Sequence, residues 1–448
     1  MILKGFIMRN RKWAAGIALT TAALMALSGC SMGGGKSSGE ATGDTNGKGK
    51  TITVWAMKGD YQDETLATIN KAFEKKTGAK VKLQIQQWDG IGTKVTTALS
   101  TDATPDIIDM GNTQVAGYAA SGGLMDLTSE KGELADGKTW IKGLEDPATV
   151  DGKLYGVPAF AAARAVIYNK QIWKDAGVSE EPKNWDEFTA DLDKVREANA
   201  SNPDFVPFYM PGQYWYSALQ FIWDAGGDVA KEEGGNWKGS VSSEKSVKGM
   251  EEWKDFENKY SSEASRSVDT ETPSMDDMLA DGKTGAILSN SATIGTVKKT
   301  NPSLTDDSLG TFAMPGKSGK NQVSMVAGSD WAVAQKSKNQ KLAIEWLKIA
   351  ASDEIQQTWV FEHDGWLPNS VQGLDKAMKS DKFPQVQKGF FEAAKNSKTT
   401  PASPNWADIE ADKSVNDFTK TVATGSSSIK DAAQQFDAHM DEVFAKKN

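Results

Sequence analysis

Tryptophan close to polar side chains is the feature of this sequence that most directly indicates binding chemistry. The chain contains fifteen Trp, against eight Tyr and two His. An indole ring presents a large flat apolar face and one N–H donor. Together with carboxylates that accept from hydroxyl groups, such rings suit a ligand that has both C–H faces and hydroxyls, as a sugar has.

The elements expected at the start of the body alternate between strands and helices. β-branched residues predict strands over 51–55, 80–86 and 106–110, and apolar residues at helical spacing predict helices over 63–77 and 90–100. This alternation favours a largely parallel, doubly wound sheet, in which ligands bind beyond the carboxyl ends of the strands. The residues that this places at the binding edge are Lys58, Asp60, Trp88, Asn112 and Gln114.

Each candidate also has a purely structural interpretation. Lys58 and Asp60 can be solvated loop charges, and Asn112 can form a turn. Trp215 lies at the start of a helix predicted over 214–225, where it can be a stacking platform at a cleft edge or can pack within the helix. The face of that helix expected to point inward carries Ala218, Phe221 and Ile222.

The first residues of the chain resemble the export signal of a bacterial lipoprotein. Basic residues precede an apolar run of about 14 residues, which is shorter than the roughly 20 needed to span a membrane. The run ends in Leu27-Ser28-Gly29-Cys30, which resembles a lipobox. We therefore predict a signal peptide over 1–29, a lipid anchor on Cys30 and a flexible tether over 30–50. A start at Met8 would leave the same pattern intact.

Composition argues against several other classes of protein. The net charge of −9 and the pI near 5.1 argue against a nucleic-acid partner. Cys30 is the only cysteine, so no disulfide forms within the chain. With two His and no Walker-type phosphate loop, the sequence predicts no metal site, no cofactor and no catalytic residues.

The order of motifs along residues 51–448 resembles that of the extracellular solute-binding proteins of carbohydrate ABC importers, the relatives of maltose-binding protein. The motifs that carry the resemblance are Thr104-Pro105-Asp106-Ile107-Ile108, Asp151-Gly152-Lys153-Leu154-Tyr155-Gly156-Val157-Pro158, Asn184-Trp185-Asp186-Glu187-Phe188, Gly328-Ser329-Asp330 and Lys341-Leu342-Ala343-Ile344-Glu345-Trp346-Leu347. Within them, Leu154–Pro158 is expected to be a short strand, and Asn184 or Asp186 is expected to cap a helix.

The resemblance implies an α/β clamshell of two discontinuous lobes, each a mostly parallel sheet flanked by helices. Three hinge crossings are expected, near 157–160, 324–328 and 361–367. Lobe one would comprise 51–158 plus 328–362, and lobe two 159–327 plus 363–448, ending in helices over 409–422 and 428–445.

The resemblance also adds candidate ligand contacts at the hinges and in the C-terminal part. Asp330 would accept from two adjacent hydroxyls, with structural capping as the alternative. His363 and Asp364 would bind hydroxyls at the third crossing, and Trp366 and Trp406 would stack on the ligand.

The function implied is that of a monomeric, extracytoplasmic lipoprotein. It would capture a di- to tetrasaccharide between its lobes and deliver it to the permease subunits of an ABC importer. Receptors for a peptide or an osmolyte remain alternatives, as does a cell-surface glycosidase that uses Asp330 and Asp364 as its carboxylate pair. The sequence leaves the identity of the sugar open.

Overall fold

The computed structural model describes residues 41–234 and 236–446, so the predicted signal peptide and Cys30 lie outside the described residues. The elements up to the first long central strand are β1 (Thr51–Met57), α1 (Asp63–Thr77), β2 (Lys80–Gln86), α2 (Ile91–Ser100), β3 (Ile107–Gly111), α3 (Val115–Ala120), α4 (Lys131–Ala135), α5 (Lys142–Glu145), β4 (Thr149–Val150), β5 (Lys153–Leu154) and β6 (Val157–Ala163).

The middle of the chain forms a second group of elements. These are β7 (Ala165–Asn169), α6 (Lys170–Asp175), α7 (Trp185–Ala198), α8 (Trp215–Asp224), β8 (Ala230–Glu233), β9 (Asn236–Gly239), α9 (Glu244–Tyr260), α10 (Met275–Ala280), β10 (Ala286–Ser289), α11 (Ala292–Thr300) and β11 (Leu309–Phe312).

The last part of the chain begins with a long central strand and is otherwise mostly helical. Its elements are β12 (Ser324–Val333), α12 (Gln340–Ala350), the helical segment Ile355–His363, α13 (Val371–Met378), α14 (Lys388–Lys395), β13 (Ser397–Lys398), α15 (Trp406–Ala411), α16 (Ser414–Thr424) and α17 (Ile429–Phe444).

The larger sheet is mixed. Its order is β13-β12-β3-β1-β2, with β6 also paired to β12. β1 is parallel to β2 and to β3, but β12 is antiparallel to both β3 and β6. In the smaller sheet, β7 is antiparallel to its neighbours β10 and β11. The expected doubly wound parallel pattern therefore holds for β1 to β3, whereas strands from distant parts of the chain join with the opposite direction.

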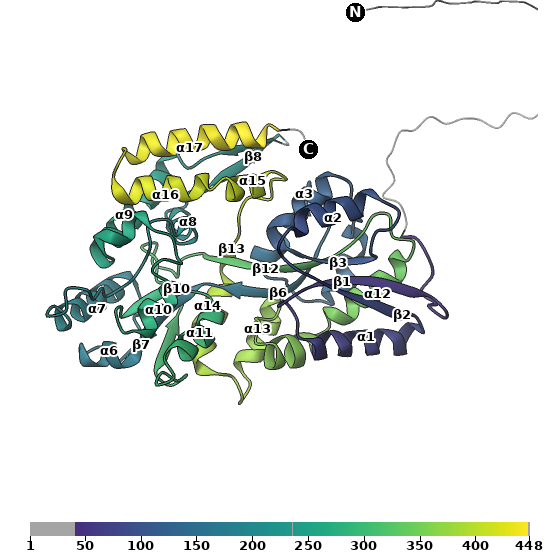
Figure 1. Ribbon diagram of the computed structural model, residues 1–448, viewed down its shortest axis with the longest axis horizontal. Helices are drawn as coiled ribbons and strands as arrows, with labels where there is room; N and C mark the ends of the chain where they lie inside the picture. Colours follow the sequence, from purple (N-terminus) through teal and green to yellow (C-terminus); the bar gives the residue numbers. More distant parts are fainter. Residues whose placement is uncertain (1–40, 235, 447–448) are drawn as a thin grey trace, which may run out of the picture. The chain divides into compact units, whose positions relative to one another are not determined.

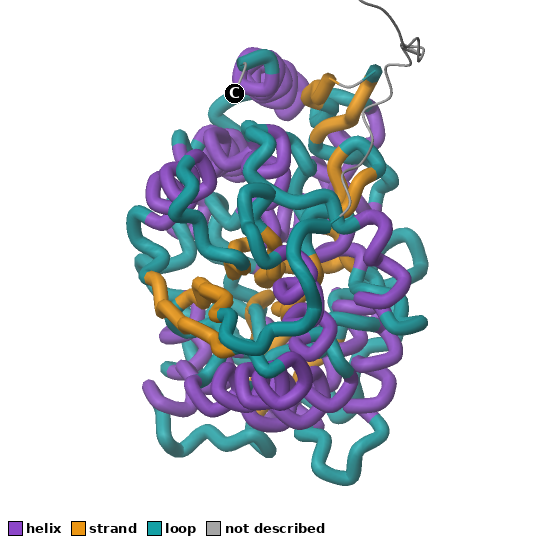
Figure 2. The backbone as a smooth tube through the Cα atoms, turned by 90° about the vertical axis from the view of Figure 1, so that its right-hand side faces the viewer, coloured by secondary structure: helices purple, strands orange, loops and turns teal. Residues whose placement is uncertain are grey.

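Two hydrophobic cores are present in the described residues, and the chain changes from one to the other at five places: 140–141, 144–148, 160–161, 326–331 and 360–361. The first core includes Phe160, Trp331 and Val360, whereas the second core includes Ala161 and Phe361, the direct neighbours of two of those residues. We call the part of the molecule that packs on the core containing Trp331 the first half. The part that packs on the core containing Phe361 is the second half. Figure 1 shows β6 and β12 running side by side between the halves. In Figure 2 strands lie near the middle of the molecule, with helices around them.

Several local predictions are confirmed. Helix α1 and strand β2 have the predicted bounds, and α8 buries the expected inward face, Ala218, Phe221 and Ile222. Asn184 caps α7, because its side chain accepts a hydrogen bond from the backbone N–H of Glu187 at 2.9 Å.

Three local predictions were wrong. The helix expected over 409–422 is instead two helices, α15 and α16, because Lys413 takes the left-handed conformation with φ 60°. The strand expected over 154–158 is interrupted between β5 and β6. The described end of the expected tether is bonded to the body: Thr42 accepts from the N–H of Lys341 at 3.0 Å, and Gly47 donates to Thr77 at 2.9 Å.

The helices of the described residues include none that is both long and apolar enough to cross a membrane.

Candidate ligand-binding site

The carboxyl ends of β1 and β2 form one edge of the larger sheet. The two strands end side by side, with Met57 paired to Gln86. The loop after β1 carries Lys58 and Asp60, and the loop after β2 carries Trp88. Trp88 is 40% exposed, which is unusual for a large hydrophobic side chain in the described residues. This edge thus offers a free indole face beside a cation and a carboxylate.

Asp60 joins three distant parts of the chain at this edge. Its Oδ2 accepts a hydrogen bond from the Ser329 hydroxyl of β12 at 2.5 Å. The Trp366 indole N–H donates to the backbone carbonyl of Asp60 at 2.6 Å. Trp366 is half-buried, and its ring stacks on that of Phe160 in β6 with centroids 4.6 Å apart. The structure therefore brings Asp60, Trp88 and Trp366 together, whereas Lys58, from the same loop, lines a separate hollow with Gln62 and Ile85.

The carboxylates under this edge are shielded from water. Burial raises the pKa of Asp60 to about 6, although hydrogen bonds from Ser329 and Trp88 oppose the shift. Burial, together with the charge of Asp60, raises the pKa of Asp109 in β3 well above its usual value. Asp109 accepts from the backbone N–H of Met57 at 2.9 Å through Oδ2, while its buried Oδ1 has no partner in the described residues.

The predicted pair His363 and Asp364 contacts the start of α1. Asp364 accepts from the Thr65 hydroxyl at 2.8 Å and from the His363 ring at 2.7 Å. The side chain of Asp364 is 1% exposed. Its carboxylate thus bonds the first turn of α1 and attaches the third predicted crossing to the first half.

Four other predicted residues point into the interior. Both carboxylate oxygens of Asp330 are buried without a partner in the described residues, and burial raises its pKa well above the usual value. The Asn112 amide donates to the carbonyl of Gly143 at 3.1 Å. Trp406 is fully buried, and Trp215 is 8% exposed with its centroid 6.3 Å from that of Trp406. These four side chains are therefore buried in the fold rather than presented at the edge of the larger sheet.

The second half contributes a polar cavity that the sequence analysis missed. It has a volume of about 280 Å³. Its lining includes Arg164, Tyr216, Asp276 and Asn290. Arg164 interrupts the apolar run of β6 and β7 as its only charge, and that single charge is the signal in the sequence that could have revealed the cavity.

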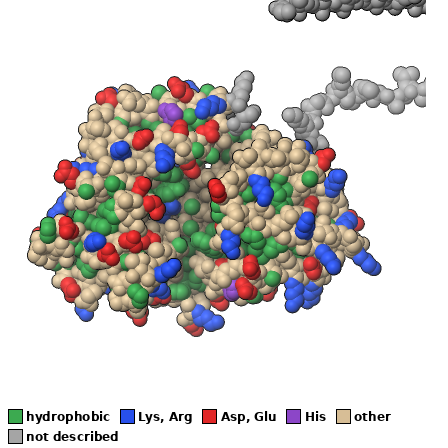
Figure 3. All heavy atoms as spheres, viewed as in Figure 1, with side chains coloured by type: hydrophobic (Ala, Val, Ile, Leu, Met, Phe, Trp, Pro, Cys, Tyr) green, Lys and Arg blue, Asp and Glu red, His purple; other side chains and the backbone are tan. Residues whose placement is uncertain are grey.

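Asn290 follows the carboxyl end of β10. The segment before α8 runs parallel to β10, with bridges from Val206 to Thr284 and from Tyr209 to Ile287. The cavity therefore lies at a carboxyl edge of the smaller sheet, as Lys58 and Trp88 lie at that of the larger one. On the face in Figure 3, the surface is hollowed between the two halves.

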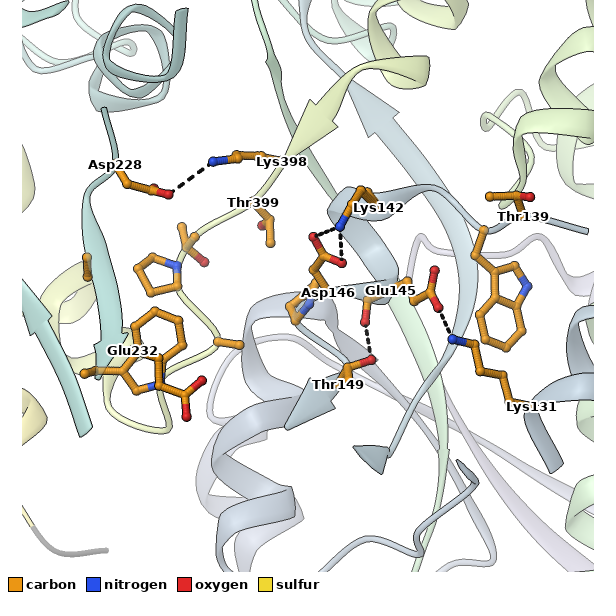
Figure 4. Close-up of a pocket in the computed structure, with 17 residues that line it drawn as sticks. Lys131, Thr139, Lys142, Glu145, Asp146, Thr149, Asp228, Glu232, Lys398 and Thr399 are labelled. Atoms are coloured by element: carbon orange, nitrogen blue, oxygen red, sulfur yellow. Dashed lines mark hydrogen bonds and ion pairs between the residues drawn. The ribbon is translucent and has the colours of Figure 1, made fainter. Parts of the chain in front are cut away.

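A larger cavity, of about 690 Å³, is lined by residues from both halves. Its chemistry differs from that of the smaller cavity, because its lysine side chains are already paired with carboxylates. Figure 4 shows that its cations face acidic partners: Lys398 lies 3.1 Å from Asp228, and Lys142 lies 2.9 Å from Asp146. A ligand there would compete with existing ion pairs. The cavity also lacks residues from the carboxyl ends of β1, β2 and β3, which makes it the weaker candidate.

Comparisons with known proteins agree with this architecture. Residues 58–357 match the family model described as bacterial extracellular solute-binding protein. The diacetylchitobiose binding protein DasA of Streptomyces coelicolor is 37% identical over 410 residues, which cover 91% of this chain and 93% of DasA. The maltodextrin-binding protein MdxE of Bacillus subtilis is 22% identical over 413 residues, covering 89% and 92%.

Solved structures show the same fold. The sugar-binding protein MalE of Xanthomonas citri superposes with a TM-score of 0.77 at 22% identity, covering 88% of this chain and 98% of MalE. The maltose-binding MalE of Listeria monocytogenes gives a TM-score of 0.75 at 20% identity, covering 89% and 99%. The fold is therefore the two-lobe α/β fold of these binding proteins.

Proposed function

Because this chain belongs to the bacterial extracellular solute-binding proteins, we propose that it captures an oligosaccharide outside the cell membrane and delivers it to an ABC importer. The observation that carries the proposal is the edge at Asp60, where an exposed and a half-buried tryptophan accompany polar groups. Indoles beside hydroxyl-binding groups suit sugar rings. The names of DasA, MdxE and MalE point to the same class of ligand.

The ligand binds between the halves and favours their closed arrangement, because it gains contacts from both. We place the lobes at 51–158 plus 328–362 and at 159–327 plus 363–448; the changes of core at 160–161 and 360–361 lie two residues from two of these boundaries, although Ile141 and Leu144 also pack on the second core. Asp60, Trp88 and Trp366 are the contacts that position supports, and Lys58 lies in the same loop as Asp60. The protein acts as a monomer without catalysis, and the lipid on Cys30 holds it near the permease.

Replacement of Trp88 tests this site. We expect Trp88→Ala to weaken oligosaccharide binding at least tenfold, because the exposed indole is the free stacking face of the first half. Tryptophan fluorescence titration with di-, tri- and tetrasaccharides measures the affinity. Trp237→Ala in the larger cavity is the matched control and should leave the affinity unchanged. If Trp237→Ala weakened binding and Trp88→Ala did not, the ligand would lie in the cavity of Figure 4, and the site proposed here would be contradicted.

A further inference from the structure

Arg164 is a buried cation whose partners are all neutral. It is 8% exposed. Its Nε donates to the Tyr214 hydroxyl at 3.1 Å, and its Nη1 donates to the carbonyl of Met325 at 3.3 Å. The guanidinium carbon lies 3.8 Å from the centre of the Tyr216 ring. In the described part of the chain, Nη2 makes no hydrogen bond and no carboxylate forms an ion pair with the guanidinium.

Such a cation is costly to bury unless something else binds it. Buried arginines are normally paired, and a guanidinium offers five N–H donors in a fixed plane. Since Arg164 lines the 280 Å³ cavity, the donors that the protein leaves free are available to a group bound there. That group must present an acceptor.

The opposite charge in the cavity limits what this group can be. Glu271 and Asp276 also line it, so its titratable side chains carry more negative than positive charge. Asp276 accepts from the Thr293 hydroxyl at 3.0 Å through one oxygen. A carboxylate or phosphate on the ligand would be repelled by these two acids. A neutral group with an acceptor at one end and a donor at the other can bond both Arg164 and Asp276.

A secondary amide is the neutral sugar substituent with that arrangement. Its carbonyl can accept from Arg164 while its N–H donates to Asp276, and its methyl group can lie against Met275. We propose that this cavity is the subsite for the acetamido group of an N-acetylated amino sugar. This inference rests on the proposed function and names its substrate class. The name of DasA, a diacetylchitobiose binding protein, is consistent with the same class.

One strand, β6, runs from the residues at Asp60 toward the cavity. Phe160, Ala162 and Arg164 alternate along β6 and its end, so their side chains share a face. Trp366 stacks on Phe160 at one end of this row. Ala162, in the middle of this row, is only partly buried. Four residues of extended chain cover about 13 Å, the span of a short oligosaccharide.

Two disaccharides with the same backbone test the inference. N,N′-diacetylchitobiose and cellobiose are both β-1,4-linked glucose-type dimers, and they differ in the acetamido groups. We expect calorimetry of the purified chain to give at least tenfold tighter binding of the acetylated sugar. Equal binding, or preference for cellobiose or a uronate disaccharide, would overturn the inference while leaving sugar capture intact. If no oligosaccharide binds at all, the proposed function itself fails, and the inference with it.

Two variants locate the preference. Asp276→Asn keeps the shape of the side chain but exchanges the charged carboxylate acceptor for a weaker neutral amide oxygen. Arg164→Lys keeps the charge but loses the planar donor fork. Both should lower the ratio of the two affinities at least fivefold with little effect on cellobiose. A folding defect would weaken the binding of both sugars together and leave the ratio of their affinities unchanged. The ratio therefore distinguishes a lost acetamido contact from a folding defect. An unchanged ratio in both variants would contradict the assignment.

Discussion

Asp60 is held at the edge of the larger sheet by Ser329 and Trp366, and its protonation follows from that burial. Folding raises its pKa from 3.8 to about 6. A carboxyl group with a raised pKa stabilises the folded state fully below its unfolded pKa, and this stabilisation is lost as the pH rises through the folded pKa. For Asp60 the loss falls between about pH 4 and pH 6.

Replacing this carboxyl group should remove that dependence. Between pH 4 and pH 7, we expect the free energy of unfolding of the wild type to fall by up to about 3 kcal/mol more than that of Asp60→Asn. Urea unfolding followed by circular dichroism at several pH values measures the difference. Parallel pH profiles for the two proteins would show that Asp60 titrates without coupling to folding.

At the scale of elements, the position of α8 depends on a glycine in α9. A Cβ added at Gly249 would lie 2.6 Å from the Phe221 carbonyl oxygen and 2.6 Å from the Ile222 Cα. Backbone cannot yield as a flexible side chain can, so any larger residue must separate the two helices. Helix α8 begins at Trp215, beside the tyrosines that hold Arg164.

Gly249→Ala should therefore destabilise the protein by about 1–3 kcal/mol, the usual cost of overpacking. Gly295→Ala is the matched control, because Gly295 lies in α11 with open space around its Cβ position. The control should be neutral or more stable by up to about 1 kcal/mol, since alanine favours helix. Thermal unfolding of both variants checks this, and equal melting temperatures would contradict the packing argument.

Elements governed by local sequence were predictable. The apolar spacing of α1 and the β-branched run of β2 contain the information that sets their bounds. The break at Lys413 was not predictable in this way, because lysine rarely takes φ 60° and no Gly or Pro marks the turn. The mixed direction of the sheets was hidden as well, since β12 and β7 pair with strands far away in the sequence.

At the scale of the whole molecule, the site depends on long-range contacts. Asp60 meets Ser329 across 269 residues and Trp366 across 306. Sequence reasoning placed Lys58, Asp60 and Trp88 at an edge because strand ends share that edge in a parallel sheet. It could not tell that Asp330 points into the core, because residue type alone does not reveal which face of β12 a side chain takes.

The central claim is that the two halves bind an oligosaccharide without altering it. Isothermal titration calorimetry of the purified chain against a panel of di- to tetrasaccharides, followed by chromatography of the recovered sugar, tests this most directly. We predict one-to-one binding of at least one oligosaccharide, recovered intact. Cleaved sugar would contradict the claim and indicate an enzyme, and the absence of binding to every oligosaccharide would indicate a receptor for another class of solute.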